Sequence, residues 1–162
     1  MERLWTPWRA KYIASSGVDS QSGSCVFCDI SRDQENDEKN FVLHRGQHNF
    51  IVLNLYPYIS GHLLVVPNKH VGELDAASKE ITDELMDLTK RSQTVLRKVY
   101  EPAGFNVGMN LGASAGAGIL GHLHVHILPR WGGDTNFMST VSETRVIPED
   151  LKTTYEKLRG RF

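Results

Sequence analysis

The chain lacks an excess of charge of either sign. Its 162 residues include 18 Lys and Arg and 19 Asp and Glu, which leaves a net charge of −1 when the histidines are neutral. This balance gives no overall field that would attract nucleic acid or an anionic membrane. The sequence also lacks an apolar run long enough to span a bilayer, and a leader with a basic start and an apolar core. We therefore expect a cytoplasmic protein whose partners include neither nucleic acid nor a membrane.

Cysteine is scarce. The two cysteines, Cys25 and Cys28, form Cys-Val-Phe-Cys. In a reducing compartment this spacing favours metal binding or redox chemistry over a structural disulfide. A redox pair is the weaker choice, because no strand-to-helix context of the thioredoxin type is predicted around it. A tetrahedral zinc site would need two further ligands, and a pair of reduced thiols without metal is the alternative.

The remaining composition is that of a globular domain, with 40% hydrophobic and 23% charged residues. The length suits one domain, or one domain with a tail. Apolar alternation and helical spacing predict strands at 41–45, 50–55, 63–66 and 105–111, a long helix at 78–100 and a short closing helix at 148–158. This order predicts an α+β fold with a mostly antiparallel sheet and one long helix.

The stretch His122-Leu123-His124-Val125-His126 carries the strongest functional signal. Alternation with apolar residues predicts a further strand that has a polar face. Three imidazoles in a row can line one small site, as metal ligands or as a nucleophile with its acid and base. The alternative is chance alternation in an exposed strand.

A loop of small residues, Gly112–Gly118, precedes the histidines. Its backbone N–H groups can approach an anion closely, and Ser114 adds a hydroxyl. The loop is not of the Walker type, because no Gly-Lys-Ser/Thr ends it. Alone it could be a simple hairpin loop, but beside the histidines it favours a phosphate site.

Together these residues resemble the histidine triad superfamily of nucleotidyl hydrolases and transferases, whose signature is His-apolar-His-apolar-His followed by two apolar residues. The strand Gly61–Pro67, which ends in Val-Val-Pro, and the Cys-x-x-Cys pair are also similar to that family. Three further segments are most similar to the bacterial branch of the family that includes diadenosine tetraphosphate phosphorylases. They are Leu53–Tyr58, Phe105–Gly112 and Pro129–Asp134.

The resemblance implies a role for each matching residue. His124 would be the nucleophile that attacks an α-phosphate, His126 would contact the phosphate and the leaving group, and His62 and His122 would brace the site. The nucleotide and its phosphates would be held by Asn54 near the ribose, and by Asn110, Ser114, Ala117 and Gly118. Much of the family has Gln where this chain has Gly118, so the contact to the leaving group falls to Ser114, Asn110 or the backbone.

Trp131 has two interpretations. It could stack on a base or close the site from a neighbouring subunit, or it could simply pack. Trp5 and Trp8 are expected to be packing or interface residues.

The resemblance also implies a structural zinc. Zinc-containing relatives complete the cysteine pair with a His after the Val-Pro strand and with the first His of the triad. Here these are His70 and His122, and His44 or His48 could take the place of His70. Such a metal would connect the N-terminal segment to the catalytic strand. Relatives form two-fold dimers with joined sheets, which we expect here too.

We therefore expect an enzyme that attacks the α-phosphate of dinucleoside polyphosphates, with hydrolysis or phosphorolysis completing the reaction. The alternatives are a phosphoramidase for mononucleotide–amine conjugates, a nucleotide-binding or sensing protein with little turnover, and a His-rich metal protein without catalysis. We expect an N-terminal extension at 1–24, the histidine triad (HIT) domain at 25–136, and a C-terminal tail with a short helix at 137–162.

Overall fold

A computed structural model describes residues 25–134 and 147–162. The expected N-terminal extension, with Trp5 and Trp8, and the first part of the tail lie outside these ranges. Within them, none of the helices has the length and apolar character needed to traverse a bilayer.

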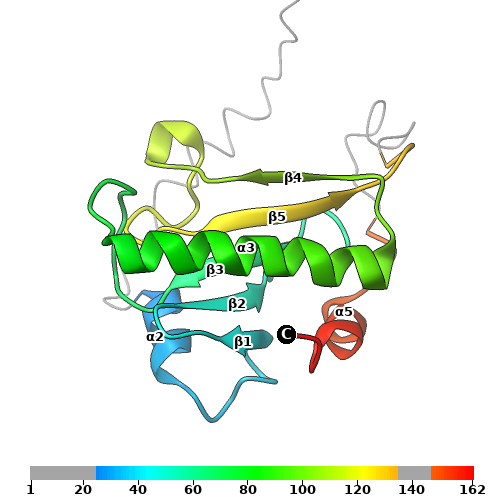
Figure 1. The fold of residues 1–162 in the computed structure, drawn as a ribbon, viewed down its shortest axis with the longest axis horizontal. Coiled ribbons are helices and arrows are strands. Elements are labelled where there is room, and N and C mark those ends of the chain that lie inside the picture. Colours follow the sequence, from blue (N-terminus) through cyan, green and yellow to red (C-terminus); the bar gives the residue numbers. More distant parts are fainter. Residues whose placement is uncertain (1–24, 135–146) are drawn as a thin grey trace, which may run out of the picture.

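The described residues form an α+β fold around a five-stranded sheet, as the sequence predicts. The strands are β1 (Val42–Arg45), β2 (Asn49–Leu53), β3 (Leu63–Pro67), β4 (Gly104–Gly108) and β5 (Val125–Arg130). They lie in the order β1-β2-β3-β5-β4, and every neighbouring pair is antiparallel. The long connection from β3 to β4 contains the main helix, which leaves β5 to insert between these two strands (Figure 1).

Helix α3 (Lys79–Tyr100) lies across one face of the sheet (Figure 1). Its buried residues include Ile81, Leu85 and Leu88, which follow helical spacing and form a continuous apolar stripe. Ser78 occupies the N-cap position with extended backbone, and the helix ends at Glu101 in the left-handed conformation, just before Pro102.

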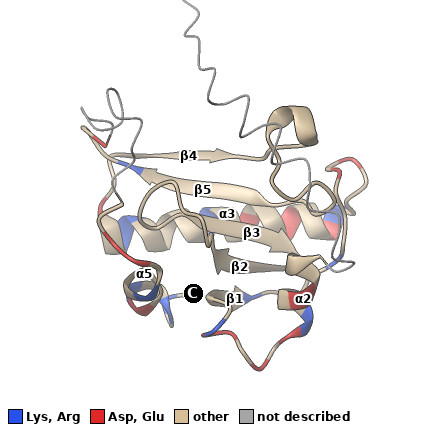
Figure 2. Ribbon diagram, turned by 180° about the vertical axis from the view of Figure 1, so that it is seen from behind, with Lys and Arg blue, Asp and Glu red and all other residues tan. Residues whose placement is uncertain are grey.

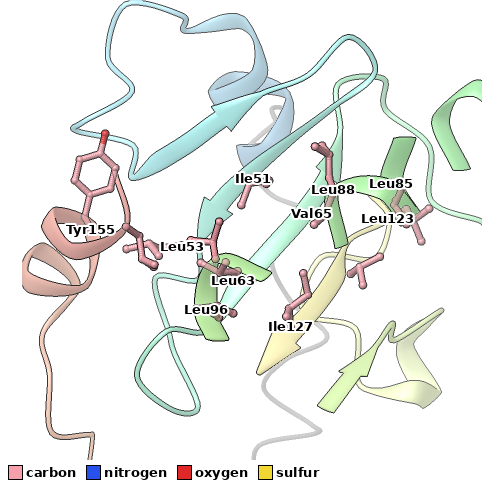
Figure 3. Close-up of a cluster of buried hydrophobic side chains, with 13 residues drawn as sticks. Ile51, Leu53, Leu63, Val65, Leu85, Leu88, Leu96, Leu123, Ile127 and Tyr155 are labelled. Atoms are coloured by element: carbon pink, nitrogen blue, oxygen red, sulfur yellow. The ribbon is translucent and has the colours of Figure 1, made fainter. Parts of the chain in front are cut away.

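The main core fills the space between α3 and the sheet (Figure 3). Alternate residues of the central strands, such as Leu63 and Val65 of β3, point into it because side chains alternate across a strand. Helix α5 (Leu151–Leu158) adds Tyr155 and Leu158 to the same core, and the Tyr155 hydroxyl donates to the backbone oxygen of Val42 at 3.2 Å. The short closing helix predicted near this position is confirmed.

Helix α2 (Val26–Arg32) packs against the opposite face. Its Phe27 and Ile30 meet a second apolar cluster that includes Phe50 and Leu64. Figure 2, seen from behind, shows charge on the helices and connecting loops, while β2 and β3 carry none. The sequence prediction missed α2, because only one turn of its apolar pattern follows the cysteines.

The strand predicted for the three histidines begins too early in the sequence. Strand β5 begins at Val125, so His126 lies in it, whereas His122 and His124 precede it and are buried. The N–H of Leu123 bonds the backbone oxygen of Val71 at 2.7 Å, in the connection after β3, and not a strand partner. That bond joins segments far apart in the sequence, so local alternation could not reveal it.

Candidate active site and metal centre

Four histidines meet on the face of the sheet that carries α2. In the antiparallel pairing of β3 with β5, Leu64 lies opposite His126, and His62 shares the face of Leu64 because it lies two residues earlier. The Nε2 atom of His62 is 2.9 Å from Nδ1 of His126. The ring of His124 is edge-on to that of His126, with centroids 5.0 Å apart. His122 follows at the end of this row, and it is as fully buried as His62.

His124 is held in one tautomer by the backbone. Its Nδ1 lies 2.9 Å from the carbonyl oxygen of His122. A carbonyl only accepts, so Nδ1 carries the proton and donates. In the neutral ring, Nε2 then holds an unshared electron pair, which is the form a nucleophilic imidazole requires.

His126 is held in the opposite tautomer through His62. The N–H of Tyr58 donates to Nδ1 of His62 at 3.2 Å, so the proton of neutral His62 sits on Nε2. That proton is donated to Nδ1 of His126. His126 therefore carries its own proton on Nε2, which makes it a donor beside His124.

Burial keeps these rings neutral. Burial, followed by the neighbouring His126 and His124, lowers the pKa of His62 to about 3. Burial and then His124 lower the pKa of His126 to about 4. Burial also lowers the pKa of His124, against an opposing contribution from its bond to the His122 carbonyl. At neutral pH the row therefore presents one electron pair and one N–H donor.

The glycine-rich loop begins beside His126. Gly108, the last residue of β4, pairs with His126, so Asn110 and the loop continue from this point. The loop contains a single 3₁₀ turn, η1 (Ala113–Ala115), between Gly112 and Gly116, both at positive φ. A Cβ built on either glycine meets no atom within 4 Å, so the backbone is open to a ligand.

Part of the donor capacity of this loop is already used. The N–H groups of Ala115, Gly116 and Ala117 bond carbonyls within the loop. The donors of the loop region that could still bind an anion are the Ser114 hydroxyl, the Asn110 side chain and the other N–H groups, including that of Gly118. Ala117 is buried, and its N–H donates to the carbonyl oxygen of Gly112 at 3.3 Å.

Asn54 and Trp131 lie at different places. The Asn54 side chain accepts from the N–H of Tyr56 at 3.0 Å and lies 3.3 Å from Nδ1 of His62, so it borders the histidine row. Trp131 follows the far end of β5, where its Nε1–H donates to the backbone oxygen of Tyr100 at 3.2 Å. Within this chain Trp131 packs against the end of α3 and away from the histidines.

The cysteine pair and two histidines form a compact group. The ligand atoms of Cys25, Cys28, His70 and His122 all lie within 4.8 Å of one another. Sulfur-to-nitrogen distances are 3.3 Å from Cys25 to His122, 3.3 Å from Cys28 to His70 and 3.6 Å from Cys28 to His122. A tetrahedron with ordinary Zn–S and Zn–N bonds has S···N edges of about 3.6 Å. The four residues therefore fit a zinc ion.

His122 is in the right tautomer for this group. Its Nε2 donates to the carbonyl oxygen of Pro67 at 2.8 Å, which turns the electron pair of Nδ1 toward the sulfurs. Neither His44 nor His48 belongs to the group that the described residues form. His70 is therefore the fourth member, as the resemblance implies.

The lowered pKa of His126 predicts a specific pH dependence of stability. In the unfolded chain this histidine titrates near its ordinary value of 6.5, but in the folded protein near 4. Between these values the unfolded chain binds more protons, so acidification lowers the free energy of unfolding. Urea unfolding across this pH window should show a steeper loss for the wild type than for His126→Gln. Equal slopes in the two proteins would contradict the neutral, buried state of His126.

Comparisons with known proteins agree with this geometry. Residues 35–133, well over half of the chain, match the HIT domain family. An AP-4-A phosphorylase of Mycobacterium tuberculosis is 45% identical over 159 residues, with 95% of this chain and 80% of that protein covered. A bis(5'-nucleosyl)-tetraphosphatase (asymmetrical) of Schizosaccharomyces pombe is 36% identical over 57% of this chain and 50% of its own length.

A solved structure extends the agreement to the fold. The Zn-bound histidine triad family protein of Mycobacterium smegmatis superposes with a TM-score of 0.69 at 26% identity, and covers 86% of this chain and 93% of its own. The histidine row, the glycine-rich loop and the Cys/His group thus occur on a fold shared with proteins of one family. The chain belongs to the HIT family.

Proposed function

We propose that this protein is an enzyme that cleaves dinucleoside polyphosphates at an α-phosphate through a nucleotidyl-histidine intermediate. One observation carries the proposal: the Nδ1–H of His124 is committed to the His122 carbonyl, and Nε2 is left as a neutral electron pair beside an N–H donor on His126. A protein that only binds nucleotides has no need of this pairing of opposite tautomers.

The atoms can be followed through the reaction. The electron pair on Nε2 of His124 forms a bond to the α-phosphorus while the bond to the bridging oxygen breaks, and the remaining nucleoside polyphosphate leaves. The Nε2–H of His126 donates to the departing oxygen, where negative charge develops. Water or inorganic phosphate then attacks the phosphorus from the same site and breaks the N–P bond, which restores His124.

The glycine-rich loop supports the same reaction. Open backbone next to His126 suits the non-bridging phosphate oxygens, and Ser114 and Asn110 supply side-chain donors. Asn54 borders the row beside His62, and we expect it to contact the ribose. The names of the relatives in M. tuberculosis and S. pombe favour diadenosine tetraphosphate as the first substrate to test.

Incubation with diadenosine tetraphosphate, with and without inorganic phosphate, tests the proposal. ATP should appear in both reactions if water can resolve the intermediate, with AMP as the second product without phosphate and ADP with it. ADP formed only with phosphate, and no turnover in its absence, would define a phosphorylase. Turnover of a nucleoside phosphoramidate with none of diadenosine tetraphosphate would instead establish the phosphoramidase alternative.

Substitution of the nucleophile separates chemistry from binding. His124→Ala should reduce turnover at least about 10³-fold, because no other group supplies the attacking electron pair. Nucleotide affinity, measured by calorimetry, should remain near that of the wild type. His48→Ala, outside the histidine row, is the matched control and should retain activity. A His124→Ala protein with turnover close to the wild type would overturn the mechanism.

We also propose that zinc occupies the Cys25, Cys28, His70 and His122 group, where it would connect α2 to the segment that precedes β5. Metal analysis of protein prepared without chelator should give about one zinc per chain, as a four-ligand site requires. Cys28→Ser should lose the metal and melt at a lower temperature than the wild type. His44→Asn should keep the metal and the melting temperature of the wild type. Protein without metal, or full occupancy in Cys28→Ser, would refute the site.

Two further expectations remain proposals. Strand β4 is the last in the sheet order and its Val107 is 46% exposed, which suits pairing with a second copy in a joined sheet. In such a dimer, Trp131 of one copy could reach the other site.

The free thiols of Cys25 and Cys28 suit a reducing compartment such as the cytoplasm.

A further inference from the structure

Phe27 lies between the two cysteines, on the turn of α2 that faces the histidines. Its side chain is only 5% exposed. The ring centroid is 5.4 Å from that of His122, edge-on at 77°, and 5.2 Å from that of His124, tilted by 54°. One buried aromatic ring thus contacts both a member of the metal group and the proposed nucleophile.

The hydrogen bond to the His122 carbonyl does not fix His124 by itself. It holds Nδ1 at one point, but the imidazole can still swing about that point and carry Nε2 away from its target. Two rings limit this motion: His126, edge-on at 5.0 Å, and Phe27 at 5.2 Å. Packed rings with little free volume restrict the rotamers of their neighbours.

Helix α2 is attached at both ends, so it can hold Phe27 firmly. At its start, Cys25 and Cys28 meet His70 and His122. At its end, the Arg45 guanidinium donates to the backbone oxygens of Ile30, Ser31 and Asp33 at 3.0, 3.2 and 2.9 Å. The ion pair of Arg45 with Asp37 at 2.7 Å keeps the guanidinium in place.

We propose that Phe27 is a positioning residue through which the metal-anchored helix α2 sets the orientation of His124. A metal held by Cys25, Cys28, His70 and His122 would fix the first turn of α2. That turn presents Phe27, and Phe27 limits the rotation of the His124 ring. The proposal rests on the proposed function, in which His124 is the nucleophile. The effect of the Phe27 ring on the orientation of the His124 ring can nevertheless be measured without any substrate.

The test compares two truncations of one apolar cluster. Phe27 and Ile30 are both buried members of this cluster, and Phe27→Leu and Ile30→Ala each remove three carbon atoms, but only Phe27 has a ring in contact with His124. Nitrogen-15 spectra of the histidines report the orientation and tautomer of His124 in the free protein. Steady-state kinetics with diadenosine tetraphosphate report kcat and KM.

Phe27→Leu should broaden or shift the His124 signals and lower kcat by at least about tenfold with KM nearly unchanged, because misaimed reacting atoms cost rate and not binding. Ile30→Ala should lose stability while its His124 signals and kcat stay close to the wild type. A raised KM with unchanged kcat in Phe27→Leu would mean that Phe27 contacts the nucleotide. That result, or unchanged His124 signals, would overturn the proposal.

Removal of the metal tests whether the Cys/His group acts on His124 through Phe27. Chelation of the wild type should reproduce the spectral change seen at His124 in Phe27→Leu, and chelation of Phe27→Leu should add little, because both act along one path. Chelation that leaves His124 unaffected in the wild type, or additive effects in the variant, would contradict transmission through Phe27. If turnover of every substrate were absent while these spectral results held, the proposed function would fail and the positioning role would stand.

Discussion

His122 makes three directional contacts, and the rest of the site depends on them. Its Nδ1 faces the sulfurs of the metal group, its Nε2–H bonds the Pro67 carbonyl at the end of β3, and its own carbonyl accepts the Nδ1–H of His124. Each contact fixes a different part of the residue: one ring edge, the other ring edge and the peptide. The residue is buried, so loss of any of these partners would leave a polar group without water to replace it.

This arrangement explains how the Cys/His group and the histidine row can share five residues of sequence. The Cys/His group uses the ring of His122, and His124 uses its backbone carbonyl. Side chains alternate between the two faces of the sheet along this stretch. Leu123 and Val125 therefore point into the main core, while the histidines point to the opposite face, which carries α2. The core on one face of the sheet thereby positions the chemistry on the other.

The tautomers follow from backbone groups and not from charged side chains. The carbonyl of His122 orients one end of the row, and the N–H of Tyr58, acting through His62, orients the other. Burial keeps the pKa of His62 and His126 low, so both rings are neutral and carry one proton each. The hydrogen bond from the neighbouring group therefore determines which nitrogen carries that proton. A row of identical residues thus acquires two different chemical functions.

Much of the fold could be predicted from the sequence. The antiparallel sheet, the long helix and the closing helix follow from apolar periodicity, and the four members of the Cys/His group follow from motif resemblance. The sequence did not reveal α2, because one turn of apolar spacing is too short to distinguish from a loop. It placed His122 and His124 in a strand, because the competing bond from Leu123 to Val71 is a long-range contact. The part played by Tyr58 leaves no signal in the sequence, since it is made by a backbone N–H.

The central claim is that His124 and His126 hold opposite tautomers before any substrate binds. Long-range proton–nitrogen correlation spectra of the free protein at neutral pH measure this directly, because protonated and unprotonated imidazole nitrogens differ widely in chemical shift. The structure predicts a proton on Nδ1 and none on Nε2 of His124, and the reverse arrangement for His126. A proton on Nε2 of His124, whether as the opposite tautomer or as the imidazolium, would contradict it.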